Sequence, residues 1–171
     1  MDKYDTFSRR LFAGFIDGLV FVPIYFLDDA IKKFSSIPFL VIGLILVYTS
    51  SYVYSIFFHW RYGQTLGKMA MKVRVVDVSE VKLLTLRQSF MRDSVFMLIE
   101  TLGLIILIFE VVNLGFFPSH NGGIDYYLSS LGFLWFLVEI VTMLTNNKKR
   151  AFHDLMAGSV VINEEFWNAK P

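Results

Sequence analysis

Several carboxylates lie inside apolar stretches of the sequence, where an ionisable side chain requires an explanation, and three of them share a common feature: Asp17, Glu100 and Glu139. If each stretch is a helix, each of these three carboxylates lies seven residues from its charged or polar end, at a common depth of roughly 10 Å. Carboxylates in such a setting take up and release protons or bind cations, and they also hydrogen-bond neighbouring helices. We predict that the three converge on one proton or cation site, with purely structural contacts as the alternative.

A charged cluster is predicted where the chain enters its first apolar stretch. Arg10 and Asp17 lie within roughly 20° of each other on a helix face. Gly14 and Gly18 share this face and permit a close helix approach. Asp154 follows a basic run near the end of the chain. We predict that Arg10, Asp17 and Asp154 form one cluster, although Arg10 alone is also typical of a helix anchor and Asp154 of a tie to the basic run.

Further polar residues lie near the same expected level, and they are interpreted as supporting groups: Ser51, Tyr52 and Arg92. The composition excludes other chemistry. The chain has no cysteine, and its three histidines lack metal-ligand spacing. The segment 63–68 resembles a phosphate loop, but it has three residues between its glycines instead of four. We therefore predict a glycine-shaped turn there, and no metal, nucleotide, other cofactor, nucleic acid or enzymatic activity.

The elements that must position these residues are membrane-spanning helices. Hydrophobic residues make up 55% of the 171 residues and charged residues 18%, with a mean hydropathy of +0.54. Spanning a hydrocarbon core of about 30 Å takes about 20 apolar residues. Four stretches qualify in a single domain covering residues 1–171: about 10–27, 38–58, 93–117 and 127–145. The sequence predicts an all-α membrane protein, a four-transmembrane-helix bundle.

The distribution of basic residues predicts the orientation. Three Lys or Arg precede the first span, seven lie in the loop 59–92 and four follow the fourth span, whereas the loop 28–37 has two and the loop 114–126 has none. Basic residues are retained on the cytosolic side. We predict a multi-pass protein with both termini and the loop 59–92 in the cytosol.

The loop and the C-terminal segment contain two β-branched runs, at about 72–78 and 159–162. Such runs are typical of strands, so we predict that they pair as a small cytosolic β element. Thr85 and Gln88 have the spacing of a capping box, which predicts that the third helix begins before its membrane entry.

These motifs together resemble the RDD family of small prokaryotic membrane proteins. The similarity rests on Arg10 with Asp17, on the segment 63–77, on Arg92 and on the segment 153–161. The family is named for one arginine and two aspartates, which the resemblance places at Arg10, Asp17 and Asp154. It also implies location in the cytoplasmic membrane, and transport, including sodium–proton antiport, as described for some members.

Two functions remain open at this stage. The first is a small secondary transporter that exchanges monovalent cations for protons through intramembrane carboxylates. The second is a non-catalytic scaffold or accessory subunit that binds a partner protein or anionic lipid. Four spans leave little room for a gated path, so the transporter hypothesis predicts a homo-oligomer, whereas the scaffold hypothesis predicts a membrane-protein partner. In both, membrane lipid surrounds the helices.

Overall fold

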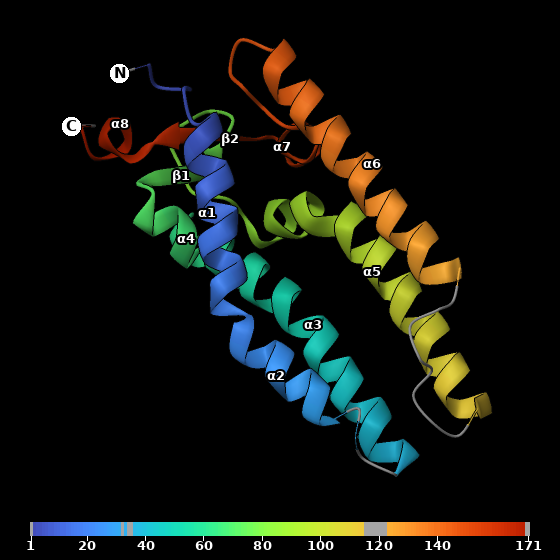
Figure 1. Cartoon of the computed structure of the whole chain (residues 1–171). Coiled ribbons are helices and arrows are strands. Elements are labelled where there is room, and N and C mark those ends of the chain that lie inside the picture. The colour runs from blue at the N-terminus through green and yellow to red at the C-terminus, as the bar shows by residue number, and fades with distance from the viewer. Residues whose placement is uncertain (1, 32, 34–35, 115–122, 170–171) are drawn as a thin grey trace.

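The computed structural model describes residues 2–31, 33, 36–114 and 123–169. The protein is mostly helical, with one small sheet. Among the described residues, two helices are long and apolar enough to cross a membrane: α3 (Ile37–Tyr62) and α5 (Leu86–Leu114). These two helices pack against each other and form the centre of the molecule. Figure 1 shows α2 beside α3 and α6 (Gly123–Thr145) beside α5.

The first apolar stretch, predicted as one span over 10–27, is divided into two helices. These are α1 (Phe7–Val20) and α2 (Val22–Ile31), separated at Phe21. Pro23 explains the break, because proline has no amide hydrogen and its ring clashes with the carbonyl of the residue four before it. At the break, the Phe21 amide donates a hydrogen bond to the carbonyl oxygen of Gly18, three residues earlier, at 3.1 Å. The first stretch is therefore a broken helix.

The boundaries of the two central helices follow from local signals. Thr85 and Gln88 form the predicted capping box, since the Gln88 amide donates to Thr85 Oγ1 at 3.2 Å and the Thr85 amide donates to Gln88 Oε1 at 3.0 Å. Helix α3 ends at Tyr62 and is capped by the next residue, Gly63, whose φ of +70° favours glycine. Helix α3 extends beyond the predicted span 38–58 at both ends. Helix α5 begins before the predicted span 93–117, and residues 115–117 lie outside the described residues. Most of the predicted loop 114–126 lies outside the described residues.

The predicted strand pairing is confirmed. Strand β1 (Val73–Asp77) pairs antiparallel with β2 (Ser159–Asn163), with Val75 opposite Val161. The alternation of side chains places Val73 and Val75 in one buried cluster and Val76 in another. Three short helices surround this sheet: α4 (Leu66–Ala70), α7 (Phe152–Ala157) and α8 (Glu164–Asn168).

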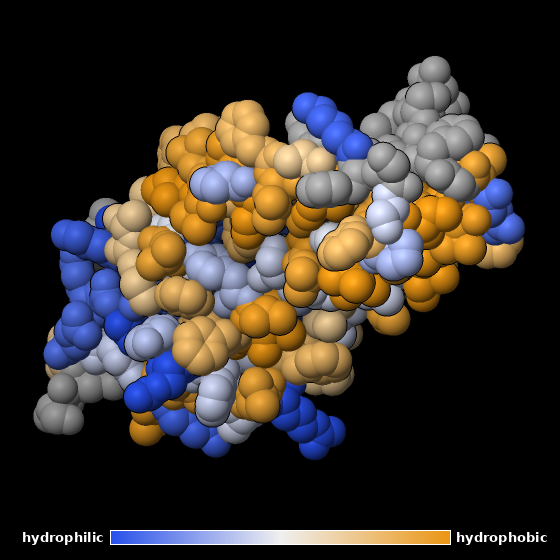
Figure 2. All heavy atoms as spheres, turned by 90° about the horizontal axis from the view of Figure 1, so that it is seen from below, coloured by the Kyte–Doolittle hydropathy of each residue, from blue (hydrophilic) through white to orange (hydrophobic). Residues whose placement is uncertain are grey.

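The first and the last described segments of the chain lie beside this sheet, at what we call the sheet end of the molecule (Figure 1). The surface in Figure 2 is hydrophilic at one end and mostly apolar over the helices. Large apolar side chains are exposed there, among them Phe15 at 69%, Phe39 at 70% and Phe109 at 69%. Exposed aromatic residues in such numbers mark a surface that faces another apolar phase.

Candidate functional site

Asp17 joins three elements near the sheet end. Its carboxylate accepts hydrogen bonds from Tyr54 Oη at 2.8 Å, from Thr65 Oγ1 at 2.6 Å and from the Gly67 amide at 2.8 Å. Gly67 is required at this place, because a Cβ atom there would lie 2.0 Å from the carbonyl oxygen of Ala13. The predicted glycine-shaped turn therefore allows the backbone of α4 to touch α1, and Asp17 holds it there.

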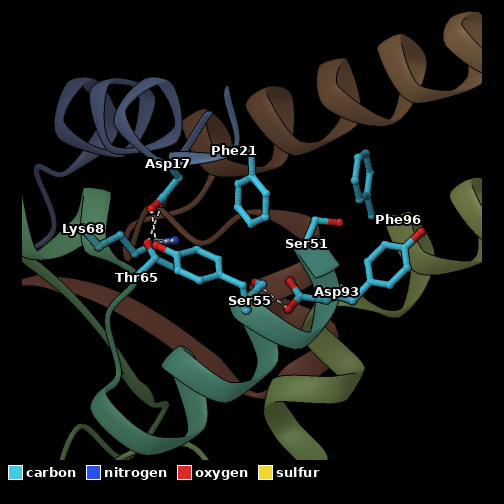
Figure 3. A pocket seen from close by; sticks show the side chains of 10 residues that line it. Asp17, Phe21, Ser51, Ser55, Thr65, Lys68, Asp93 and Phe96 are labelled. Carbon is cyan, nitrogen blue, oxygen red and sulfur yellow. Dashed lines mark hydrogen bonds between the residues drawn. The ribbon is translucent and has the colours of Figure 1, made fainter. Parts of the chain in front are cut away.

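A cavity of about 210 Å³ lies beside Asp17, and we call it the Asp17 cavity. Figure 3 shows Asp17, Thr65 and Lys68 on one side of it and Asp93 with Ser55 on another. Asp93 accepts a hydrogen bond from Ser55 Oγ at 2.7 Å. The cavity thus contains two carboxylates and one ammonium group, surrounded by hydroxyl groups.

The ammonium group of Lys68 is perturbed by this environment. Burial lowers its pKa to about 8, and the positive charge of Arg92 acts in the same direction. Asp17 and Asp93 oppose this shift by stabilising the charged form. Lys68 therefore loses its proton close to physiological pH, unlike an ordinary lysine.

A second cavity of about 300 Å³ adjoins the first, and we call it the Glu100 cavity. Phe21, Ser51 and Phe96 line both cavities. Glu100 lies in the second cavity, together with the apolar side chains of Ile24 and Val47. The two cavities therefore form a continuous recess between α1–α2, α3 and α5.

A separate charged cluster surrounds Asp154, which is completely buried. Its carboxylate accepts hydrogen bonds from Arg10 Nη2 at 2.8 Å, from Arg92 Nε at 3.0 Å and from Ser159 Oγ at 3.0 Å. Burial opposes ionisation, but the charges of Arg10, His153 and Arg92 outweigh it and hold the pKa of Asp154 well below its usual value. This cluster joins α1, α5 and α7 to the sheet.

The structure separates the predicted site residues into three groups. Arg10 and Asp154 are ion-paired, as a cluster requires, but Asp17 instead binds the start of α4. Glu139 pairs with Nδ1 of His153, at the edge of the Asp154 cluster. Glu100 lies in the Glu100 cavity. Asp17, Glu100 and Glu139 therefore have three different sets of neighbours.

The supporting residues also divide between the two centres. Arg92 lies in the Asp154 cluster, where its Nη1 contacts His59 Nε2 at 2.8 Å. Ser51 and Tyr52 line the Asp17 cavity. Sequence reasoning missed Lys68 and Asp93 as site residues. The sequence alone carries no signal for Lys68, because its place near Asp17 depends on the packing of α4 against α1.

Glu80 forms a third polar centre, at the sheet end. Its carboxylate pairs with Lys3 and with Lys148 Nζ at 2.7 Å, and Tyr4 Oη donates to it at 2.7 Å. Burial opposes ionisation, but the hydrogen bonds from Lys148, Lys3 and Tyr4 lower the pKa of Glu80 to about 2. This carboxylate ties the N-terminal segment to the turn after α6.

Long apolar helices with exposed apolar surfaces, which meet a small sheet and buried ionic centres at one end, are typical of a helical membrane protein. The RDD family model matches residues 4–158, and the chain belongs to the RDD family. RDD proteins are membrane proteins. No curated protein and no solved structure matches the chain.

Proposed function

We propose that this RDD-family protein is a small secondary transporter that exchanges a monovalent cation for a proton at the Asp17 cavity. One observation carries the proposal: the partly buried ammonium of Lys68 shares the cavity with Asp17 and Asp93, and its pKa is about 8. A group that titrates near physiological pH beside two carboxylates is suited to exchange a proton for another positive charge.

The charge balance of the cavity is the basis of the proposed exchange of a proton for a cation. When Lys68 is protonated, its ammonium compensates the carboxylate charge. When Lys68 releases its proton to water, the carboxylates of Asp17 and Asp93 attract a cation in its place. Oxygen atoms of Ser55 and Thr65 lie in the same cavity and are suitable ligands for a hard cation. One proton leaves as one cation enters, which is the minimum requirement for antiport.

This function assigns Glu100 a different role from Asp17. Glu100 lies farther along the recess, in the Glu100 cavity, where it can receive the cation after the Asp17 cavity. Glu139 is paired with His153 outside the recess and supports the structure instead. Of the three carboxylates predicted from the sequence, the proposed exchange thus uses two in sequence, Asp17 first and Glu100 second.

The proposed setting is the prokaryotic cytoplasmic membrane. We propose four membrane-spanning segments, with α1 and α2 together as the first, and both termini in the cytosol. The common position of the first and the last described segments at the hydrophilic sheet end supports this arrangement (Figure 1). A chain of this size encloses little aqueous volume, so we propose that the transporter is a homo-oligomer.

The scaffold function is favoured by a different surface. Val81, Leu86 and Phe90 are 75%, 52% and 49% exposed near the start of α5. Lys82 and Arg87 line an open hollow of about 420 Å³ beside them. Basic groups suit the headgroups of anionic lipid, and the apolar groups beside them suit its acyl chains. Native mass spectrometry should then show retained phosphatidylglycerol that the Arg87→Gln variant loses.

Proteoliposomes test the transport function. The purified protein should move protons, reported by an enclosed pH dye, when a gradient of a monovalent cation, either inorganic or organic, is applied. Lys68→Met should abolish the coupling to pH, and Asp93→Asn should reduce the flux. Lys82→Gln is the control, because that lysine is exposed and lies outside the Asp17 cavity. Flux no greater than that of empty liposomes would contradict the proposal.

A further inference from the structure

The recess described above is aromatic as well as acidic. Phe21, Tyr52, Tyr54 and Phe96 all line the Asp17 cavity. The rings of Phe21 and Tyr54 meet edge to face, with centroids 5.2 Å apart. In Figure 3, Phe21 and Phe96 stand on either side of Ser51, Asp17 lies beyond Phe21, and Asp93 lies below Ser51 beside Ser55. Aromatic rings therefore supply much of the wall of a cavity that also contains two carboxylates.

This wall distinguishes between kinds of monovalent cation. A sodium ion is held by oxygen ligands and gains little from phenyl rings. A substituted ammonium group has few or no hydrogens to donate, and it is attracted instead to ring faces and to carboxylate charge. A cavity lined by aromatic rings and carboxylates, such as the one around Phe21 and Phe96, is therefore suited to bind a substituted ammonium group.

A second observation concerns the Tyr52 hydroxyl. This residue is only 7% exposed, and its hydroxyl lies beside the side chains of Glu100 and Thr101. Tyr52 lines the Asp17 cavity, and its neighbour Glu100 lines the Glu100 cavity, so this polar pair lies where the two cavities join.

The charge and shape of the recess favour one occupant. Among the described residues that line it, three have carboxyl groups (Asp17, Asp93 and Glu100) and one, Lys68, has an ammonium group. The recess is thus complementary to a positive charge. Beyond the aromatic part, the Glu100 cavity is lined by Ile24 and Val47, which suit an alkyl or aryl group.

We propose that the cation taken up in this recess is a lipophilic organic monocation, a substituted ammonium whose charged group lies among Phe21, Phe96 and Asp93 and whose apolar part lies in the Glu100 cavity. This inference rests on the proposed function, because it names the cation class that the same site exchanges. The ligand enters with one positive charge as the proton of Lys68 leaves to water, so no other reactant is needed.

The test uses benzyltrimethylammonium, a rigid quaternary ammonium, with the full chain in detergent and isothermal titration calorimetry. Wild type should bind it, and should bind its uncharged carbon analogue, neopentylbenzene, at least tenfold more weakly. Phe96→Leu should weaken binding about fivefold, the size of a lost cation–π contact. Phe109→Leu is the matched control on the same helix, because Phe109 is exposed and lies outside the recess. That control should bind as wild type does.

The outcomes separate this inference from the proposed function. Binding that rises as the pH increases through about 8, and becomes independent of pH in Lys68→Met, supports it. Equal binding of the uncharged analogue, or wild-type affinity in Phe96→Leu, overturns it. If benzyltrimethylammonium does not bind while sodium-driven proton flux persists, the cation class is wrong and the exchange function stands. If neither binding nor flux occurs, both fail.

Discussion

Replacing Gly67 with alanine should separate α4 from α1. The new Cβ would lie 2.0 Å from the Ala13 carbonyl oxygen and 2.9 Å from Cγ of Asp17. Ordinary contacts are about 3.4 Å or longer, so backbone must move by more than about 1 Å. No flexible side chain can relieve the contact with Ala13, because the carbonyl belongs to the backbone of α1.

The expected cost combines two effects. Overpacking a buried contact costs about 1 to 3 kcal/mol. Losing the hydrogen bond from the Gly67 amide to the Asp17 carboxylate costs about 1.5 to 3 kcal/mol. A loss of about 3 kcal/mol or more lowers the melting temperature of a chain of this size by roughly 6 to 12 °C.

Thermal unfolding of the purified protein in detergent measures this effect. Gly14→Ala is the matched control, because no described atom lies within 4 Å of a Cβ there and alanine favours a helix interior. That variant should unfold at or slightly above the wild-type temperature. A Gly67→Ala melting temperature within about 2 °C of wild type would refute the close contact between α1 and α4.

Three further predictions concern the other ionic centres and the topology. Arg10→Ala should destabilise the protein by about 3 to 5 kcal/mol in chemical unfolding, because it leaves the buried Asp154 with one guanidinium fewer; a loss below about 1 kcal/mol would contradict this. Glu80, whose folded pKa is about 2, should contribute stability above pH of about 4.5 that is lost as the pH falls toward 2, and Glu80→Gln should flatten this slope in pH-dependent melting curves. A cysteine at Ser36 should react with an impermeant thiol reagent in whole cells and one at Ser79 should not; the reverse pattern would overturn the orientation.

Local signals in the sequence were sufficient for several elements. The β-branched runs predicted β1 and β2, because a buried strand needs such residues whatever surrounds it. Thr85 and Gln88 predicted the start of α5, since a capping box acts within one helical turn. The break at Phe21 was also encoded locally, in Pro23, but the apolar run concealed it.

The site was less predictable because it depends on contacts between distant segments. Counting residues gives the depth of Asp17, Glu100 and Glu139, but a rotation of 100° per residue means that depth does not fix the direction of a side chain. The role of Lys68 depends on Gly67 meeting α1, 50 residues from Asp17. No property of the 63–68 segment alone shows that contact.

Proton release on cation binding tests the central claim most directly. A pH indicator in weakly buffered detergent solution at pH near 8 records protons released when sodium, potassium or benzyltrimethylammonium chloride is added. We predict a release by wild type that saturates with one of these cations, and no release by Lys68→Arg, which keeps the positive charge without titrating in this range. Absence of release with all three cations, or an equal release by Lys68→Arg, would contradict exchange of a cation for the Lys68 proton.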